Sequence, residues 1–166
     1  RVYVVVAVTP PPSVGLIDRF LVAAELQGIS VSIVLNKCDL DRAAVERGRE
    51  LLACYVEVGY EVFEVSALSQ LGLEPWREAM RDGFSVLAGH SGVGKSSLIN
   101  AMFPGLDLAV RQTNEMTGKG RHTTSVSTCH AISGVWPNGG LLADTPGVRS
   151  FGLQGIEFTA LVGGFR

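Results

Sequence analysis

Residues 89–96 have the composition and the spacing of a phosphate-binding loop. They read Gly-His-Ser-Gly-Val-Gly-Lys-Ser, which matches the pattern G-x-x-x-x-G-K-[ST] at every position. Its glycines let successive backbone N–H groups converge on an anion, its lysine reaches the β- and γ-phosphates, and its hydroxyl binds Mg²⁺. We therefore expect Lys95 to act on the phosphates of a nucleoside triphosphate. The residues expected to contact the nucleotide here are Gly89, Ser91, Gly92, Val93, Gly94, Lys95, Ser96 and Ser97.

The flanking residues decide between this site and a glycine-rich turn that binds nothing. Residues 84–88 predict a buried strand, and residues 95–103 predict a helix with its apolar residues on one face. A strand, a loop and a helix in that order form the context in which the pattern binds phosphate. The sequence therefore predicts a nucleotide-binding site, with Ser96 as a metal ligand.

A guanine-reading motif follows the apolar residues 31–35, which predict another strand. It reads Asn36-Lys37-Cys38-Asp39 and fits the pattern N-K-x-D. The Asp39 carboxylate would accept hydrogen bonds from the ring N–H and the exocyclic amine of guanine, which adenine does not offer in that arrangement. Asn36 would contact the base edge and brace the phosphate loop, and the Lys37 stem would cover the ring. An ATPase is a competing interpretation, and Asp39 argues against it.

Ser66 and Ala67 follow the next predicted strand, residues 61–65. In GTPases the backbone N–H of the alanine in such a pair meets the guanine oxygen. The dipeptide alone is not specific, and its position one strand after N-K-x-D gives it weight. We therefore expect both residues at the base-binding site.

Residues 144–147 read Asp-Thr-Pro-Gly and fit the D-x-x-G element of GTPases. Asp144 would reach Mg²⁺ through a water molecule, and the Gly147 N–H would sense the γ-phosphate. One of Thr123 and Thr124, with Thr124 favoured, would close over the metal from the other side. Hydrolysis would release both contacts and relax both loops.

The apolar periodicity predicts the elements that position these motifs. Expected strands cover residues 2–8, 31–35, 61–65, 84–88, 123–132 and 141–143, with a hairpin turn at 136–140, and expected helices cover 14–27, 41–55, 74–81 and 95–103. We expect Ser13 to cap the first helix, and the second helix to bury Leu51 and to present Arg49 on a solvated face. The guanine-reading half precedes the phosphate half, the reverse of an ordinary GTPase. The expected fold is therefore α/β, a circularly permuted P-loop GTPase domain with a mostly parallel sheet and helices on both faces.

The composition excludes several classes of protein. A chain of 166 residues that is 46% hydrophobic is an apolar-rich globular domain and not a disordered segment. Its net charge of −2 excludes a general nucleic-acid binder, so an RNA contact would be a local patch. Cys38, Cys54 and Cys129 are odd in number and lack C-x-x-C spacing, so we expect a reducing compartment and no metal site built from them. The apolar residues 2–8 are too few to cross a membrane, and no membrane association is expected.

In four stretches the chain resembles the RsgA (YjeQ) family of circularly permuted GTPases, which depend on the small ribosomal subunit. These stretches are Pro10-Pro11-Pro12 with residues 15–19, residues 89–100, Gly-Lys-Gly-Arg-His-Thr-Thr at 118–124, and Asp-Thr-Pro-Gly-Val-Arg-Ser-Phe-Gly-Leu at 144–153. Other permuted ribosome-assembly GTPases share the motif order, but typically have Pro-Asn-Val-Gly-Lys-Ser and lack the Arg-His-Thr-Thr and Phe-Gly-Leu signatures. A GTPase of large-subunit assembly is therefore the nearest alternative.

The resemblance implies a GTP hydrolase that acts in late maturation of the small ribosomal subunit. It also implies that GTP hydrolysis is slow in the isolated protein and is accelerated by that subunit. It implies GTP or GDP with Mg²⁺ as ligands. It also implies that the small subunit and its rRNA are the partners of the parent protein. We expect that protein to be a monomer in the bacterial cytoplasm, with an organelle as the alternative. Family members usually add an N-terminal OB-fold and a C-terminal zinc module. We expect neither in residues 1–166, which would form the GTPase domain alone, and zinc only in that further module.

The resemblance also bears on the residue that orients the attacking water. Val148 stands where many GTPases have a glutamine for this purpose. The resemblance implies His122 in that role, beside the metal-binding threonine, and the alternative is that His122 contacts only RNA or solvent. Arg121 or Arg149 could instead stabilise transition-state charge. The missing glutamine also keeps a second class in view, a GTP-dependent binding switch with negligible turnover.

Overall fold

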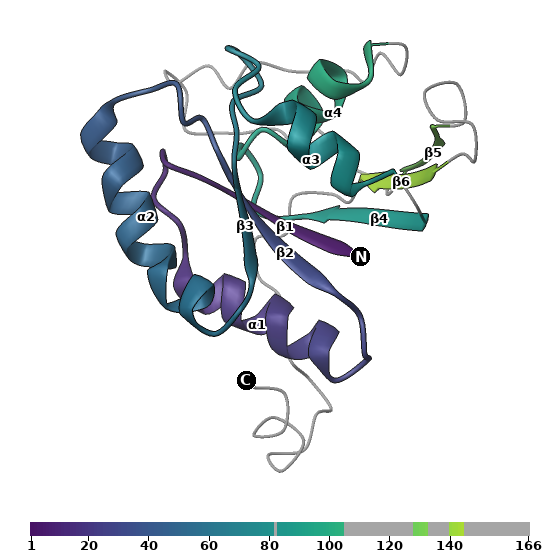
Figure 1. Cartoon of the computed structure of the whole chain (residues 1–166), viewed down its shortest axis with the longest axis horizontal. Helices are drawn as coiled ribbons and strands as arrows, with labels where there is room; N and C mark the ends of the chain where they lie inside the picture. Colours follow the sequence, from purple (N-terminus) through teal and green to yellow (C-terminus); the bar gives the residue numbers. More distant parts are fainter. Residues whose placement is uncertain (82, 105–127, 133–139, 145–166) are drawn as a thin grey trace.

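The computed structural model describes residues 1–81, 83–104, 128–132 and 140–144, and in these ranges six strands form one sheet (Figure 1). The strands are β1 (Val2–Ala7), β2 (Val31–Asn36), β3 (Glu61–Glu64), β4 (Gly83–Ala88), β5 (Thr128–Ala131) and β6 (Gly140–Asp144). They lie in the order β3-β2-β1-β4-β6-β5. Neighbouring strands are parallel except β5 and β6, which are antiparallel. The expected mostly parallel sheet is confirmed.

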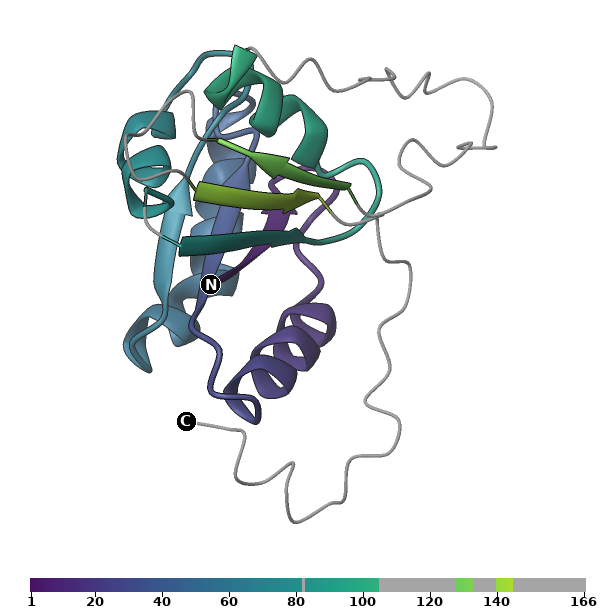
Figure 2. The same cartoon turned by 90° about the vertical axis from the view of Figure 1, so that its right-hand side faces the viewer.

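Helices cover both faces of this sheet (Figure 1, Figure 2). The helices α1 (Val14–Glu25) and α2 (Arg42–Glu57) pack on one face, and α3 (Leu73–Ala79) and α4 (Lys95–Met102) pack on the other. Along β1, Val4 and Val6 join the core beneath α1 and α2, whereas Tyr3 and Val5 join the core beneath α3 and α4. Both faces of β1 are therefore buried, which explains its unbroken apolar sequence.

The helix boundaries agree with the sequence to within two residues, but the expected cap of α1 is wrong. Ser13 is the N-cap residue of α1, yet its side chain makes no capping hydrogen bond. Its carbonyl oxygen instead accepts from the N–H groups of Leu16 and Ile17, so backbone bonds hold this first turn. In α2 the side chain of Asp41 does cap the helix, because its Oδ2 accepts from the Ala44 N–H at 3.0 Å.

Two expectations about exposure are also wrong. Leu51 is 39% exposed because it lies beside, and not on, the buried stripe of α2, which consists of Ala44, Val45, Gly48, Leu52 and Tyr55. Phe84 is 48% exposed because it lies at the start of β4, the end remote from α4. The expectation for Arg49 is confirmed, since its side chain is 51% exposed, and its guanidinium also forms an ion pair with Glu64 at the end of β3.

Several predicted features lie outside the described residues. They include the hairpin turn before Gly140 and the first part of the strand predicted from residue 123. The antiparallel pairing of β5 with β6 is the arrangement of the two arms of a hairpin. Among the helices that the structure describes, none combines the length and the apolar character needed to span a bilayer.

Candidate nucleotide-binding site

The predicted motifs gather at one edge of the sheet because the strands that carry them are parallel. Ala7 of β1 is in register with Asn36 of β2, and Leu35 is in register with Glu64 of β3. On the other side of β1, β4 runs parallel to it and leads into the phosphate loop. The carboxyl ends of parallel strands are where α/β sheets bind ligands.

The phosphate loop is seated tightly against its neighbours at two glycines. A Cβ added to Gly89 (φ +151°) would lie 2.2 Å from the carbonyl oxygen of Val5, and one added to Gly94 (φ +96°) would lie 2.5 Å from the Asn36 Nδ2 atom. Real Cβ atoms do not approach so closely, so both positions require glycine. The loop is therefore fixed to β1 through Gly89 and to the guanine-reading motif through Gly94.

Lys95 begins α4 and places a buried cation over the loop. The side chain is 7% exposed, and Nζ donates to the carbonyl oxygens of Gly89 at 2.9 Å and of His90 at 3.2 Å. The N–H groups of a first helical turn add partial positive charge at the same place. Lys95 and this turn together form a site that favours an anion.

A cavity of about 330 Å³ lies beside the loop and brings the two predicted base-reading motifs together. Its lining consists of Asn36, Lys37, Asp39, Leu40, Ser66, Ala67, Leu68, Gly94 and Ser97. Every one of these residues was predicted from the sequence to contact nucleotide except Leu40 and Leu68. Leu68 is 86% exposed, and both leucines directly follow the polar motifs, so they offer apolar surface to a planar ring.

Asn36 joins the base-reading motif to the phosphate loop. Its Nδ2 donates to the carbonyl oxygen of Val93 at 2.8 Å, which is the brace expected from the sequence. The side chain is buried, and its Oδ1 has no hydrogen-bond partner among the described residues. A buried acceptor without a protein partner is available to a ligand or to a water molecule.

Lys37 and Ser66 fix the backbone on the two sides of the cavity. Lys37 has a φ of +67°, and its Nζ donates to the carbonyl oxygen of Thr9 at 2.8 Å, which holds the stem in place. The hydroxyl of Ser66 is buried and accepts from the N–H groups of Leu68 and Ser69 at 3.1 and 3.0 Å. This turn places Ala67 in the lining of the cavity.

The residues expected to bind the metal are described only in part. Ser96 is half-buried in the first turn of α4, and Asp144 ends β6 in register with Leu87 of β4, next to the phosphate loop. The predicted residues His122, Thr124 and Gly147 lie outside the described ranges, as do Thr123, Val148, Arg121 and Arg149. Within those ranges no group of three His, Cys, Asp or Glu residues gathers. A Mg²⁺ ion suits such a site, because it takes one or two protein oxygens and completes its shell with phosphate and water.

Cys38, the variable residue of N-K-x-D, connects the loops on either side of the cavity. Its N–H donates to the carbonyl oxygen of Val65 at 3.1 Å, and its Sγ donates to that of Leu35 at 3.2 Å. Burial raises the pKa of the thiol to about 11, and the nearby Glu64 carboxylate acts in the same direction. The side chain is therefore a neutral donor at physiological pH.

We expect Cys38 to react slowly with iodoacetamide at pH 8. A thiol of pKa near 11 is about 0.1% thiolate at that pH, but a more basic thiolate is a better nucleophile, so alkylation should be about 20-fold slower than for a free cysteine of pKa near 8.5. Time-resolved labelling followed by peptide mass spectrometry measures each cysteine separately, and the exposed Cys54 serves as the internal reference. Labelling of Cys38 at the rate of Cys54 would contradict the raised pKa.

The family model and the relatives that match this chain carry the same family name. The family model described as RsgA GTPase matches residues 1–154. The protein named "Small ribosomal subunit biogenesis GTPase RsgA" from Pseudomonas aeruginosa (strain LESB58) is 43% identical over 166 residues, which cover 99% of this chain and 48% of that protein. The protein of the same name from Gemmatimonas aurantiaca is 46% identical over 151 residues, 91% of this chain and 47% of that protein.

Two solved structures share the fold. YjeQ from Thermotoga maritima aligns with a TM-score of 0.66 and 36% identity over 89% of this chain and 47% of its own. YloQ, described as a circularly permuted GTPase, aligns with a TM-score of 0.69 and 30% identity over 99% of this chain and 50% of its own. These structures confirm the predicted fold. This chain spans about half the length of the relatives that it matches.

Proposed function

The chain belongs to the RsgA GTPase family, and from this premise we propose that it binds GTP and GDP with Mg²⁺ and hydrolyses GTP to GDP and phosphate. The observation that carries the proposal is the hydrogen bond from Asn36 Nδ2 to the Val93 carbonyl oxygen, at 2.8 Å. It joins a cavity lined by the base-reading motifs to a loop that favours an anion. A nucleotide has those two parts, a base and a chain of phosphates.

Each predicted site residue has a role in this proposal. Asp39 and the Ala67 N–H read the guanine edge, with Asn36, Lys37 and Ser66 holding them in place. Lys95 and the N–H groups of residues 89–97 bind the phosphates. Ser96, Thr124 and Asp144 hold Mg²⁺, which neutralises charge on the β- and γ-phosphates when it is bound. Gly147 contacts the γ-phosphate, and His122 orients the attacking water in place of the glutamine that Val148 replaces.

For the longer protein we propose a part in maturation of the small ribosomal subunit. The support is the name of the relatives, small ribosomal subunit biogenesis GTPase, together with 42–46% identity over most of this chain. The proposed partners are that subunit and its rRNA. The proposed location is the bacterial cytoplasm, where ribosomes assemble. With a net charge of −2 the chain would touch RNA through a local patch.

GTP turnover tests the proposal. The rate would be measured for this chain and for the full-length parent, each alone and with purified small or large ribosomal subunits. We expect slow intrinsic turnover and strong acceleration of the parent by small subunits only. Acceleration by large subunits would favour the alternative assembly role. Nucleotide binding with negligible turnover in every mixture would favour a binding switch, the second candidate, which Val148 keeps in view.

A further inference from the structure

We propose that Arg49 is a positioning residue for the base cavity, because its ion pair with Glu64 fixes the two base-reading loops relative to each other. The inference rests on the proposed binding of guanine nucleotides. Arg49 lies outside every motif of the site, in the third turn of α2. Its effect would pass through the backbone and not through contact with the nucleotide.

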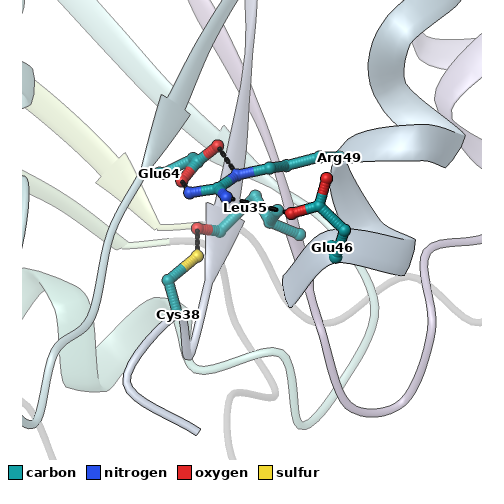
Figure 3. A network of polar contacts seen from close by, with 5 residues as sticks. All are labelled: Leu35, Cys38, Glu46, Arg49 and Glu64. Atoms are coloured by element: carbon teal, nitrogen blue, oxygen red, sulfur yellow. Dashed lines mark hydrogen bonds and ion pairs between the residues drawn. The ribbon is translucent and has the colours of Figure 1, made fainter. Parts of the chain in front are cut away.

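The ion pair has the geometry of a strong one (Figure 3). The Arg49 Nε and one terminal nitrogen donate to the two oxygens of Glu64, both at 2.7 Å, and the other terminal nitrogen donates to Glu46 at 3.2 Å. Two parallel bonds fix the orientation of both side chains as well as their distance. The guanidinium accordingly lowers the pKa of the Glu64 carboxyl. This pair is therefore more than a loose surface contact.

Glu64 holds one of the two base-reading loops. It is the last residue of β3, and Val65, Ser66 and Ala67 follow it directly. The Val65 N–H donates to the Leu35 carbonyl oxygen at 2.8 Å. A shift of Glu64 would therefore move the Ser66-Ala67 turn that lines the cavity.

Arg49 holds the other loop through the helix that carries it. The motif ends at Asp39, and α2 begins three residues later, capped by Asp41. The Cys38 N–H of this loop donates a hydrogen bond to the Val65 carbonyl oxygen at 3.1 Å. The backbone bonds, the helix and the ion pair thus form a closed ring around the carboxyl ends of β2 and β3. Figure 3 shows the ion pair of this ring and the bond from Cys38 to Leu35.

The other described ion pairs do not have this arrangement. Arg77 with Glu74 and Arg81 with Glu78 each join two residues of the α3 region, three positions apart. Arg1 pairs with Glu61 at the opposite end of β3 from the cavity. Arg81, half-exposed like Arg49, therefore provides a matched control for the loss of one surface guanidinium.

The stability contributed by the pair should depend on pH with a definite sign. Because Arg49 lowers the pKa of Glu64, with Cys38 and Glu46 the other titratable groups nearby, the folded state holds the Glu64 proton less tightly than the unfolded state. The stabilisation is therefore present above the ordinary glutamate pKa of about 4.3 and is lost as the pH falls through the lowered pKa.

We accordingly expect Glu64→Gln to lower the Tm by about 2 °C at pH 7, and this Tm difference to shrink as the pH falls below about 4.3. Thermal unfolding of the two proteins between pH 3 and pH 7 measures this, and Glu78→Gln controls for the loss of a carboxylate. A Tm difference that grows towards low pH would contradict the assigned sign.

Competition between GDP and ADP tests the positioning role. ADP shares the ribose and phosphates of GDP, but it cannot use Asp39 or the Ala67 N–H in the same way. We expect Arg49→Gln to weaken GDP binding about threefold to fivefold, to leave ADP binding unchanged, and so to lower the preference for guanine by the same factor. Arg49→Lys keeps the charge but cannot make two parallel bonds. Its preference for GDP over ADP should therefore lie between that of the parent chain and that of Arg49→Gln. Dissociation constants come from displacement of a fluorescent GDP analogue at fixed Mg²⁺.

The outcomes separate this inference from the proposed function. A fall in the preference for GDP in Arg49→Gln, with Arg81→Gln unchanged, supports the positioning role. An equal loss of GDP and ADP binding means that Arg49 serves only the fold, and it overturns the inference, as does an unchanged preference. If the parent chain itself binds GDP no better than ADP, the proposed guanine site fails, and the inference fails with it.

Discussion

Asp39→Asn is expected to bind GDP about 10²–10⁴-fold more weakly than the parent chain, because two charge-assisted hydrogen bonds are lost. Asp39 lies in the lining of the base cavity, where a carboxylate can accept from both the ring N–H and the exocyclic amine of guanine. An asparagine side chain offers one acceptor and one donor. The donor would face the exocyclic amine of guanine, which also donates, so the pair would be repulsive as well as incomplete.

The same reasoning predicts that Asp39→Asn binds a xanthine nucleotide more tightly than the parent chain does. Xanthine has a carbonyl oxygen in place of the exocyclic amine, so the asparagine donor and acceptor would both be satisfied. Displacement titrations with GDP and XDP measure the change in preference. Asp18→Asn is the matched control, since Asp18 accepts a hydrogen bond from Tyr55 at 2.7 Å, away from the cavity lining, and asparagine can still accept it. Unchanged GDP affinity in Asp39→Asn would show that the carboxylate does not read the base.

The fold and most of the cavity could be predicted because their signals are local in sequence. Residues 89–96 specify the phosphate loop by residue type, and the close approaches at Gly89 and Gly94 show why those types are required. The apolar, valine-rich sequence of β1 indicates a strand buried on both faces. The order of the motifs then indicated the permutation, because each motif must follow a particular strand.

The features that could not be predicted depend on contacts between distant elements. Arg49 and Glu64 are fifteen positions apart in different elements, and the packing of α2 against β3 brings them together. The exposure of Leu51 depends on the rotation of α2 over the sheet, which periodicity fixes only to within one residue. Leu68 follows a dipeptide that is not specific, and it lies in the cavity lining because the two base-reading loops lie side by side.

Lys95→Met is expected to remove most of the stabilisation of the chain by nucleotide while leaving the free chain close to its original stability. In the free chain the buried ammonium donates to two carbonyl oxygens of the loop, those of Gly89 and His90. Methionine fills nearly the same volume and removes a charge that is costly to bury, which offsets the loss of those bonds. We expect the Tm of the free variant to lie within about 4 °C of the parent.

The response to GDP should differ much more between the two proteins. A ligand at 100 times its Kd stabilises a protein by about 2.7 kcal/mol, which corresponds to about 5–10 °C for a chain of this length. Without the ammonium, the phosphates lose their buried charge partner, and a Kd raised about 100-fold would reduce this shift to about 1–2 °C. Thermal unfolding with and without GDP and Mg²⁺ measures both quantities, with Arg47→Met as the control for removing an exposed cation from α2. A full GDP shift in Lys95→Met would mean that the phosphates are held elsewhere. A Tm of the free variant far below that of the parent chain would mean that Lys95 is needed for the stability of the fold itself.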